Sequence, residues 1–141
     1  MIIDAKDLIL GRLASAVAKH ALNGEKVSIV NCEKAVITGK KFTIVTKMNM
    51  RMFEIGHHLR GPFYSREPEV FVKKSIQGML SYKSARGSAA LKRIKCYIGT
   101  PAEFKDQKAE SVDHAHISKS NAGDYVSVAQ ICKLQGSTRL K

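Results

Sequence analysis

The stretch MIIDAKDLILGRLASAVAKHALNGEKVSIVN, residues 1–31, decides the fold class. Residues 2–5 are typical of a short strand, and residues 27–31 form a second apolar run, short enough to lie inside a sheet. Gly24 suits the left-handed residue that ends the intervening helix. A strand, a helix and a strand within about 30 residues predict a βαβ unit with parallel pairing and a right-handed crossover. The helix over residues 11–23 is indicated by one apolar stripe: Leu13, Ala14, Val17, Ala18, Ala21 and Leu22.

Further short elements follow this unit. Residues 35–38 resemble a strand that ends at Gly39. Residues 40–55 alternate as a strand would, but they also carry a helical stripe. Sixteen residues without a turn signal, rich in Met and Lys, favour the helix. Pro68 fits the first turn of another helix, and the expected buried side of that helix is Val72, Ile76, Met79 and Leu80.

The next helix and strand are predicted between residues 85 and 99. Ser88 is expected to cap a short helix that carries Leu91 and Ile94. Residues 96–98 are then expected to form a strand that Gly99 ends.

Near the C-terminus, Ser127 and Gln130 have the spacing of a capping box, and Gly136 can stop the helix that they begin. The alternation of strands and helices predicts an α/β sandwich around a small, mostly parallel sheet. The length of 141 residues is that of a single domain, residues 1–141.

The charge of the chain is concentrated in its middle. Lys and Arg number 24 against 12 Asp and Glu, a formal charge of +12. Residues 40–95 hold thirteen basic and three acidic side chains, a net charge of +10, while residues 1–39 and 96–141 carry +1 each. Solubility alone does not require this asymmetry, so a polyanion partner is expected. No apolar run reaches membrane-spanning length and no signal peptide opens the chain, so a soluble, cytoplasmic protein is expected.

Motifs of nucleotide-binding enzymes do not match. A phosphate-binding loop ending at Gly39-Lys40 would need Gly where Lys34 stands, and no GxGxxG occurs. Residues 38–39 could still present backbone N–H groups to a phosphate, or they could form only a turn that needs Gly. The basic segment has no paired carboxylates, so the sequence does not predict an enzyme.

Metal and cofactor sites are not expected either. The pairs His57/His58 and His114/His116 lack the spacing that places two ligands on one helix face, and no acidic partner adjoins them. No CxxC motif exists. The three cysteines are therefore expected to be free thiols that pack as small hydrophobic groups: Cys32, Cys96 and Cys132.

The strongest local signal for nucleic acid is RGPFYSR, residues 60–66. Arginine matches phosphate geometry, and aromatic rings stack on unpaired bases. In the alternative, Phe63 or Tyr64 anchors the loop on the protein. The small residues 87–90 are expected to allow close approach to a phosphate ridge, and residues 57–66 are expected to be mobile until RNA binds. The candidate RNA contacts are Lys40, Lys41, Arg51, His57, His58, Arg60, Phe63, Tyr64, Arg66, Lys73, Lys74, Lys83, Arg86, Lys92, Arg93 and Lys95.

Several motifs together resemble the universal large-subunit ribosomal protein L-thirteen family. The tail over residues 125–136 is similar to its archaeal and eukaryotic branch. Ser65, Glu67, Gln77 and Ser81 depart from the residues expected of the family. The motifs that carry the resemblance are GRLAS (11–15), VNCEKAVITG (30–39), RGPF (60–63), GML (78–80), RG (86–87) and ALKRIKCYIGTP (90–101).

The resemblance implies a three-layer α/β/α sandwich around a four-stranded parallel sheet. It also implies a basic RNA-binding extension in the middle of the chain, with a Gly/Pro tip at residues 57–69 and a peripheral C-terminal segment at residues 102–141 that ends in a short helix. The expected partners are large-subunit ribosomal RNA and neighbouring ribosomal proteins, with no cofactor, membrane or small-molecule substrate. The expected role is in subunit assembly and architecture.

Two other classes of protein fit the sequence less well. An RNA-modifying enzyme would need a cofactor loop or an acid–base pair. A DNA-binding regulator would need a recognition helix for the major groove and usually a symmetric dimer. The basic segment instead mixes loop, Gly-Pro tip and helices, which suits an irregular RNA surface.

Overall fold

A parallel sheet of three strands organises the chain, as seen in a computed structural model that describes residues 1–57, 59–105, 107 and 109–140. Its strands are β1 (Ile2–Asp4), β2 (Val27–Val30) and β4 (Ile94–Cys96), in the order β1-β2-β4. Both pairings are parallel. The predicted βαβ unit is confirmed, and β2 is the central strand.

Helix α1 (Leu10–Leu22) joins β1 to β2 and packs its predicted stripe into the core. Leu13, Ala14 and Val17 are fully buried. Gly24 follows the helix with φ +102°, the left-handed conformation predicted for it.

Among the described residues the parallel sheet has three strands, so the expected four-stranded sheet is not confirmed. Strand β3 (Val36–Thr38) pairs antiparallel with β5 (Tyr125–Ser127) in a separate two-stranded sheet. The reason is that the C-terminal segment returns to β3 and supplies its partner, so β3 is not part of the parallel sheet.

Helix α5 (Val128–Leu134) begins directly after β5, at the predicted cap. Ser127 Oγ accepts a hydrogen bond from the Gln130 N–H at 3.2 Å. Gly136 follows the helix with φ +82°, as its predicted stop. Both predictions are confirmed.

The helix predicted over residues 40–55 is confirmed over residues 41–54, as α2 (Lys41–Asn49) followed by a π-helical turn (Met50–Glu54). Helix α3 (Pro68–Gln77) buries Val72 and Ile76, and Leu80 beyond it is also buried. Met79 was expected to be buried as well, but it is 46% exposed. The helix ends at Gln77, so Met79 lies in the following turn and off the buried stripe.

Helix α4 (Ala85–Arg93) begins earlier than predicted. Ser84 is its cap, because its Oγ accepts a hydrogen bond from the Gly87 N–H at 3.1 Å. The prediction of Ser88 as the cap is therefore wrong, since Ser88 lies inside the helix. Ile94 begins β4 instead of continuing the helix, which shifts the strand predicted at residues 96–98 toward the N-terminus.

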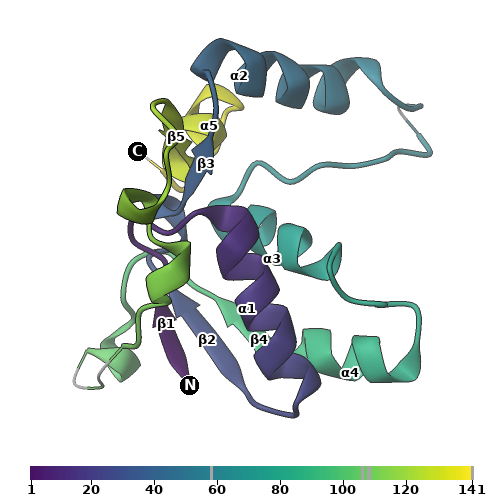
Figure 1. Cartoon of the computed structure of the whole chain (residues 1–141). Coiled ribbons are helices and arrows are strands. Elements are labelled where there is room, and N and C mark those ends of the chain that lie inside the picture. The colour runs from purple at the N-terminus through teal and green to yellow at the C-terminus, as the bar shows by residue number, and fades with distance from the viewer. Residues whose placement is uncertain (58, 106, 108, 141) are drawn as a thin grey trace.

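The helices α1, α3 and α4 gather beside the parallel sheet (Figure 1), and α1 packs against both α3 and α4. A second helical layer stays a prediction. The C-terminal segment reaches the main core through Ala115, Val128 and Cys132. Within the described part of the chain, no helix is long and apolar enough to cross a membrane.

Candidate nucleic-acid interface

The basic segment forms one side of the molecule. Figure 1 shows α2 at the top of the view, a loop that turns at the right and runs back beneath α2, and then α3 and α4 below it. We call residues 40–67 the arm, and the remainder of the described chain the body. The predicted RNA contacts therefore come from the arm, α3, α4 and β4 instead of a single helix.

The arm stands apart from the core. Neither α2 nor the π-helical turn contains a buried residue. Phe42 is 81% exposed, and Lys40 and Lys41 at the start of α2 are exposed as well. Arg51 is half-buried at the far end of the helix. The arm therefore presents cations and unpaired aromatic surface together.

The two aromatic residues of the Gly/Pro tip differ in their exposure. Phe63 is 69% exposed, while Tyr64 is half-buried. The Lys74 ammonium lies 4.3 Å from the centre of the Tyr64 ring and donates a hydrogen bond to the Phe63 carbonyl at 2.9 Å. The anchoring alternative thus holds for Tyr64, and Phe63 is left available for stacking.

The other predicted contacts at the tip are exposed side chains. His57, Arg60 and Arg66 all face solvent. His58 was also predicted as a contact, and it lies outside the described residues.

The body continues the basic side along α3, α4 and β4. Lys83, Arg86, Lys92 and Lys95 are exposed, and Lys73 is half-buried.

Arg93 has an intramolecular role that its sequence context did not suggest. Its guanidinium donates to the Ala21 carbonyl in the last turn of α1 at 3.3 Å. A cation at this end of a helix is favoured by the helix dipole. Arg93 therefore holds α4 against α1 in addition to adding positive charge.

The acidic groups of the basic segment are largely occupied by the C-terminal tail. The Glu67 carboxylate accepts hydrogen bonds from the Ser137 and Thr138 hydroxyls at 3.0 and 3.4 Å. The Glu69 carboxylate pairs with Arg139 at 2.5 Å. Among the described residues, no Lys or Arg of residues 40–95 forms a salt bridge. Lys74 and Arg93 donate to backbone carbonyls, and the charge of the described Lys and Arg on this side is not neutralised by a carboxylate.

The structure limits phosphate approach at two of the places considered from the sequence. The Gly39 N–H already donates to the Asp124 carbonyl at 2.8 Å, so it is not available to a phosphate, and the turn alone explains this glycine (φ +126°). The small residues 87–90 are expected to allow close approach to a phosphate ridge; Gly87 and Ala90 are buried, whereas Ser88 is half-buried and Ala89 is exposed. Gly87 instead packs closely under the Ser81 carbonyl, where a Cβ would lie 2.1 Å from the oxygen.

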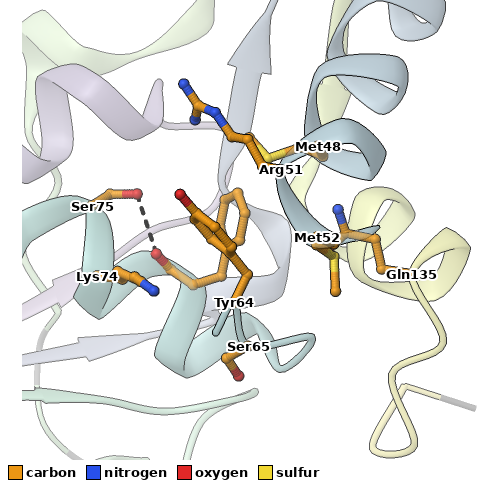
Figure 2. Close-up of a pocket in the computed structure, with 9 residues that line it drawn as sticks. Met48, Arg51, Met52, Tyr64, Ser65, Lys74, Ser75 and Gln135 are labelled. Carbon is orange, nitrogen blue, oxygen red and sulfur yellow. Dashed lines mark hydrogen bonds between the residues drawn. The ribbon is translucent and has the colours of Figure 1, made fainter. Parts of the chain in front are cut away.

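A pocket of about 190 Å³ lies where the arm meets the body. Figure 2 shows its lining, with residues of α2 and the π-helical turn on one side and residues of α3 on the other. We call it the arm–body pocket. Sequence reasoning did not identify it, because its walls come from four separate segments: Met48, Arg51, Met52, Tyr64, Ser65, Phe71, Lys74, Ser75 and Gln135.

The cysteines are free thiols, as predicted, and two of them interact. Cys32 follows β2 and Cys96 ends β4, the neighbouring strand. A hydrogen bond between the two side chains raises the pKa of Cys32, helped by burial, and lowers the pKa of Cys96. Burial raises the pKa of Cys132 to about 12. Within the described residues, no three His, Cys, Asp or Glu side chains gather into a metal site.

Comparison with known proteins gives one consistent result. Residues 1–103 match the sequence model of the family described as ribosomal protein L13. The chain is 42% identical over 136 residues to the large ribosomal subunit protein uL13 of Methanococcoides burtonii, an alignment covering 96% of this chain and 97% of the relative. It is 41% identical over 137 residues to the protein of the same name from Methanosarcina barkeri, again covering 96% and 97% of the two chains. A relative of that name from Thermoplasma volcanium is 44% identical over 118 residues, 84% of this chain and 86% of the relative.

Proposed function

The chain belongs to the ribosomal protein L13 family, and from this premise we propose that it binds large-subunit ribosomal RNA through the arm, α3 and α4. It is a structural, non-enzymatic constituent of the large ribosomal subunit, and its partners are ribosomal RNA and neighbouring ribosomal proteins. Its place of action is the cytoplasm, where such subunits work. The finer proposal concerns which side chains contact the RNA.

The proposal rests on the Lys and Arg side chains of the basic segment, which lack carboxylate partners among the described residues. Thirteen Lys and Arg lie between residues 40 and 95, and none of them is paired with a carboxylate in the described part of the chain. Two of the three acidic residues there, Glu67 and Glu69, are engaged by the C-terminal tail. This arrangement leaves a strongly positive surface that a phosphate backbone would neutralise with release of counterions.

Exposed aromatic groups on the arm supply the second kind of contact. Phe42 and Phe63 have large exposed rings among these cations. Such rings stack on unpaired bases, which are the usual targets of sequence-specific RNA recognition. We therefore assign phosphate contacts to the exposed Lys and Arg of this side, and base stacking to the arm.

Charge reversal at matched sites tests the location of the interface. One variant changes four exposed lysines of the basic side to Glu, and the control changes four exposed lysines elsewhere, so that both alter the net charge equally. The test set is Lys40, Lys41, Lys83 and Lys92, and the control set is Lys6, Lys26, Lys105 and Lys119.

The measurement is RNA affinity against salt, using a ribosomal RNA fragment and a filter-binding assay. Each lost phosphate contact removes about 0.7–0.9 from the slope of log affinity against log salt, so four lost contacts flatten it by about 3. The control variant should keep the slope of the wild type, although its lower net charge reduces the RNA affinity at every salt concentration. Equal loss of slope in both variants would refute the proposed interface.

A further inference from the structure

The arm–body pocket has the size of a single flat ring system. Its volume of about 190 Å³ exceeds the roughly 150 Å³ of an engineered cavity that holds benzene. It falls short of the roughly 300 Å³ at which sites for drug-sized ligands begin. Met48 and Met52 on the arm contribute thioethers, and Tyr64 contributes an aromatic ring. Both kinds of group make favourable contacts with a flat π-system.

One polar group of the lining lacks a partner. Gln135 is 5% exposed, and its buried Oε1 accepts no hydrogen bond from the described residues. Buried side-chain acceptors without a partner are rare in folded proteins, because each forfeits its hydration. The vacant acceptor calls for an N–H or O–H donor that the protein itself does not supply.

Two cations of the lining lie away from this amide. Figure 2 shows Lys74 and the Arg51 guanidinium on the opposite side of Tyr64 from Gln135. Neither cation has a carboxylate partner among the described residues. The pocket therefore combines flat apolar walls, an acceptor at one side and positive charge at the other. This is the pattern of a nucleotide, whose base carries donors and whose phosphate is anionic.

We propose that the arm–body pocket holds one unpaired adenine nucleotide of the bound RNA. The base lies between the thioethers of Met48 and Met52 and the ring of Tyr64, its exocyclic amine donates to Gln135 Oε1, and its phosphate contacts Arg51 and Lys74. Adenine is the base that a Gln amide matches through two hydrogen bonds, to N6 and N7. The inference rests on the proposed function and adds a base-specific subsite to it.

Short single-stranded RNAs test the subsite directly. The probes are a fluorescent uridine heptamer and the same heptamer with a central adenosine, and their binding to the full chain is followed by anisotropy. The wild type should bind the adenosine heptamer about tenfold more tightly, as expected of one satisfied two-bond contact. Adenosine 5′-monophosphate provides a third arm that separates a free nucleotide from a nucleotide within an RNA chain.

Variants on one helix separate base reading from a general effect on folding. Gln135→Met removes the acceptor and keeps an apolar chain of similar length, and Gln130→Met on the exposed side of α5 is the matched control. Gln135→Met should lose the tenfold preference for the adenosine heptamer. Gln130→Met should retain the preference. Unfolding curves of both variants establish that they are folded under the conditions of the assay.

Each outcome decides the matter. Equal affinity of the wild type for the two heptamers, as a pocket filled only with water would give, overturns the subsite. A preference that survives in Gln135→Met also overturns it. If the monophosphate binds as tightly as the adenosine heptamer, the ligand is a free nucleotide and the RNA assignment is wrong. Salt-dependent binding without preference defeats the subsite alone, whereas no salt-dependent binding of either heptamer defeats the proposed function as well.

Discussion

Gly87→Ala should destabilise the protein, although the same change elsewhere in a helix is expected to stabilise it. Gly87 lies in the first turns of α4, and a Cβ at this position would be 2.1 Å from the Ser81 carbonyl oxygen and 2.5 Å from its carbon. Gly11 in α1 provides the matched control, since a Cβ there meets nothing within 4 Å. Neither residue has a positive φ. The two substitutions therefore differ in the space around the new methyl group.

The expected difference follows from two opposing effects. Replacing a helical Gly by Ala gains about 0.5–1 kcal/mol through the lower conformational entropy of the unfolded chain. This gain is common to both variants. At Gly87 the methyl group displaces backbone atoms, and overpacking of this kind costs about 1–3 kcal/mol. Gly11→Ala should thus raise the free energy of unfolding, and Gly87→Ala should fall below Gly11→Ala by about 1–3 kcal/mol.

Urea unfolding followed by circular dichroism measures both variants against the wild type. The midpoint should rise for Gly11→Ala and fall for Gly87→Ala, with unchanged slopes of free energy against urea. If Gly87→Ala matches Gly11→Ala in stability, the turn before α4 yields without cost, and the close contact with Ser81 does not fix the position of that helix. A changed slope would instead indicate an altered unfolded or native ensemble.

Three further outcomes are expected. Ser84→Ala and Ser127→Ala should each lower the free energy of unfolding by about 1 kcal/mol, because each removes a helix cap; a loss near zero at both sites, measured by urea unfolding, would contradict the assigned caps. Iodoacetamide at pH 8 should modify Cys96 before Cys132, since the pKa of Cys96 is lowered and burial raises the pKa of Cys132 to about 12; mass mapping of the folded protein checks the order, and modification of Cys132 first would refute it. Amide hydrogen exchange over residues 59–66 should be fast in the free protein and slow once ribosomal RNA is bound, and strong protection without RNA would exclude ordering on binding.

Local signals in the sequence were sufficient for the first third of the fold. The βαβ unit and its buried stripe follow from the hydrophobic periodicity, and the stop follows from a single glycine, Gly24, which adopts a positive φ. The capping pair Ser127 and Gln130 is equally local. In each case, the residues that determine the structure are neighbours in the chain, so a single sequence contains the whole argument.

The errors have two causes. The cap of α4 is Ser84, whose Oγ accepts a hydrogen bond from the Gly87 N–H; Ser88 offers the same capping group four residues later, and the spacing of polar residues does not distinguish the two. The other error arises because a distant segment decides the pairing of a strand. Strand β3 has the composition of a parallel strand, yet its partner is β5, about 90 residues further along. Strand propensity gives no information about the partner of a strand.

The same limit applies to the binding side. Charge density identified the basic segment, because charge is additive and needs no geometry. The arm–body pocket required residues as far apart as Met48 and Gln135 to meet, so neither its acceptor nor its cations could be combined from the sequence. The distribution of charge along the sequence thus predicts the electrostatic part of the proposed RNA recognition, while the proposed base-specific part depends on the tertiary fold.

The sequence of residues 40–55 is compatible with both a strand and a helix, and the structure shows why. Their apolar side chains fit a strand and a helix equally well, because packing against a core selects neither: α2 forms without burying a single residue. A nine-residue helix is too short to be stable by itself in water, since most helices rely on an apolar face packed elsewhere. The exposed ring of Phe42 and the thioethers beside the pocket are then understandable as groups held for a partner. We expect the arm to reach its final order only when it binds RNA, with the body as the frame from which it extends.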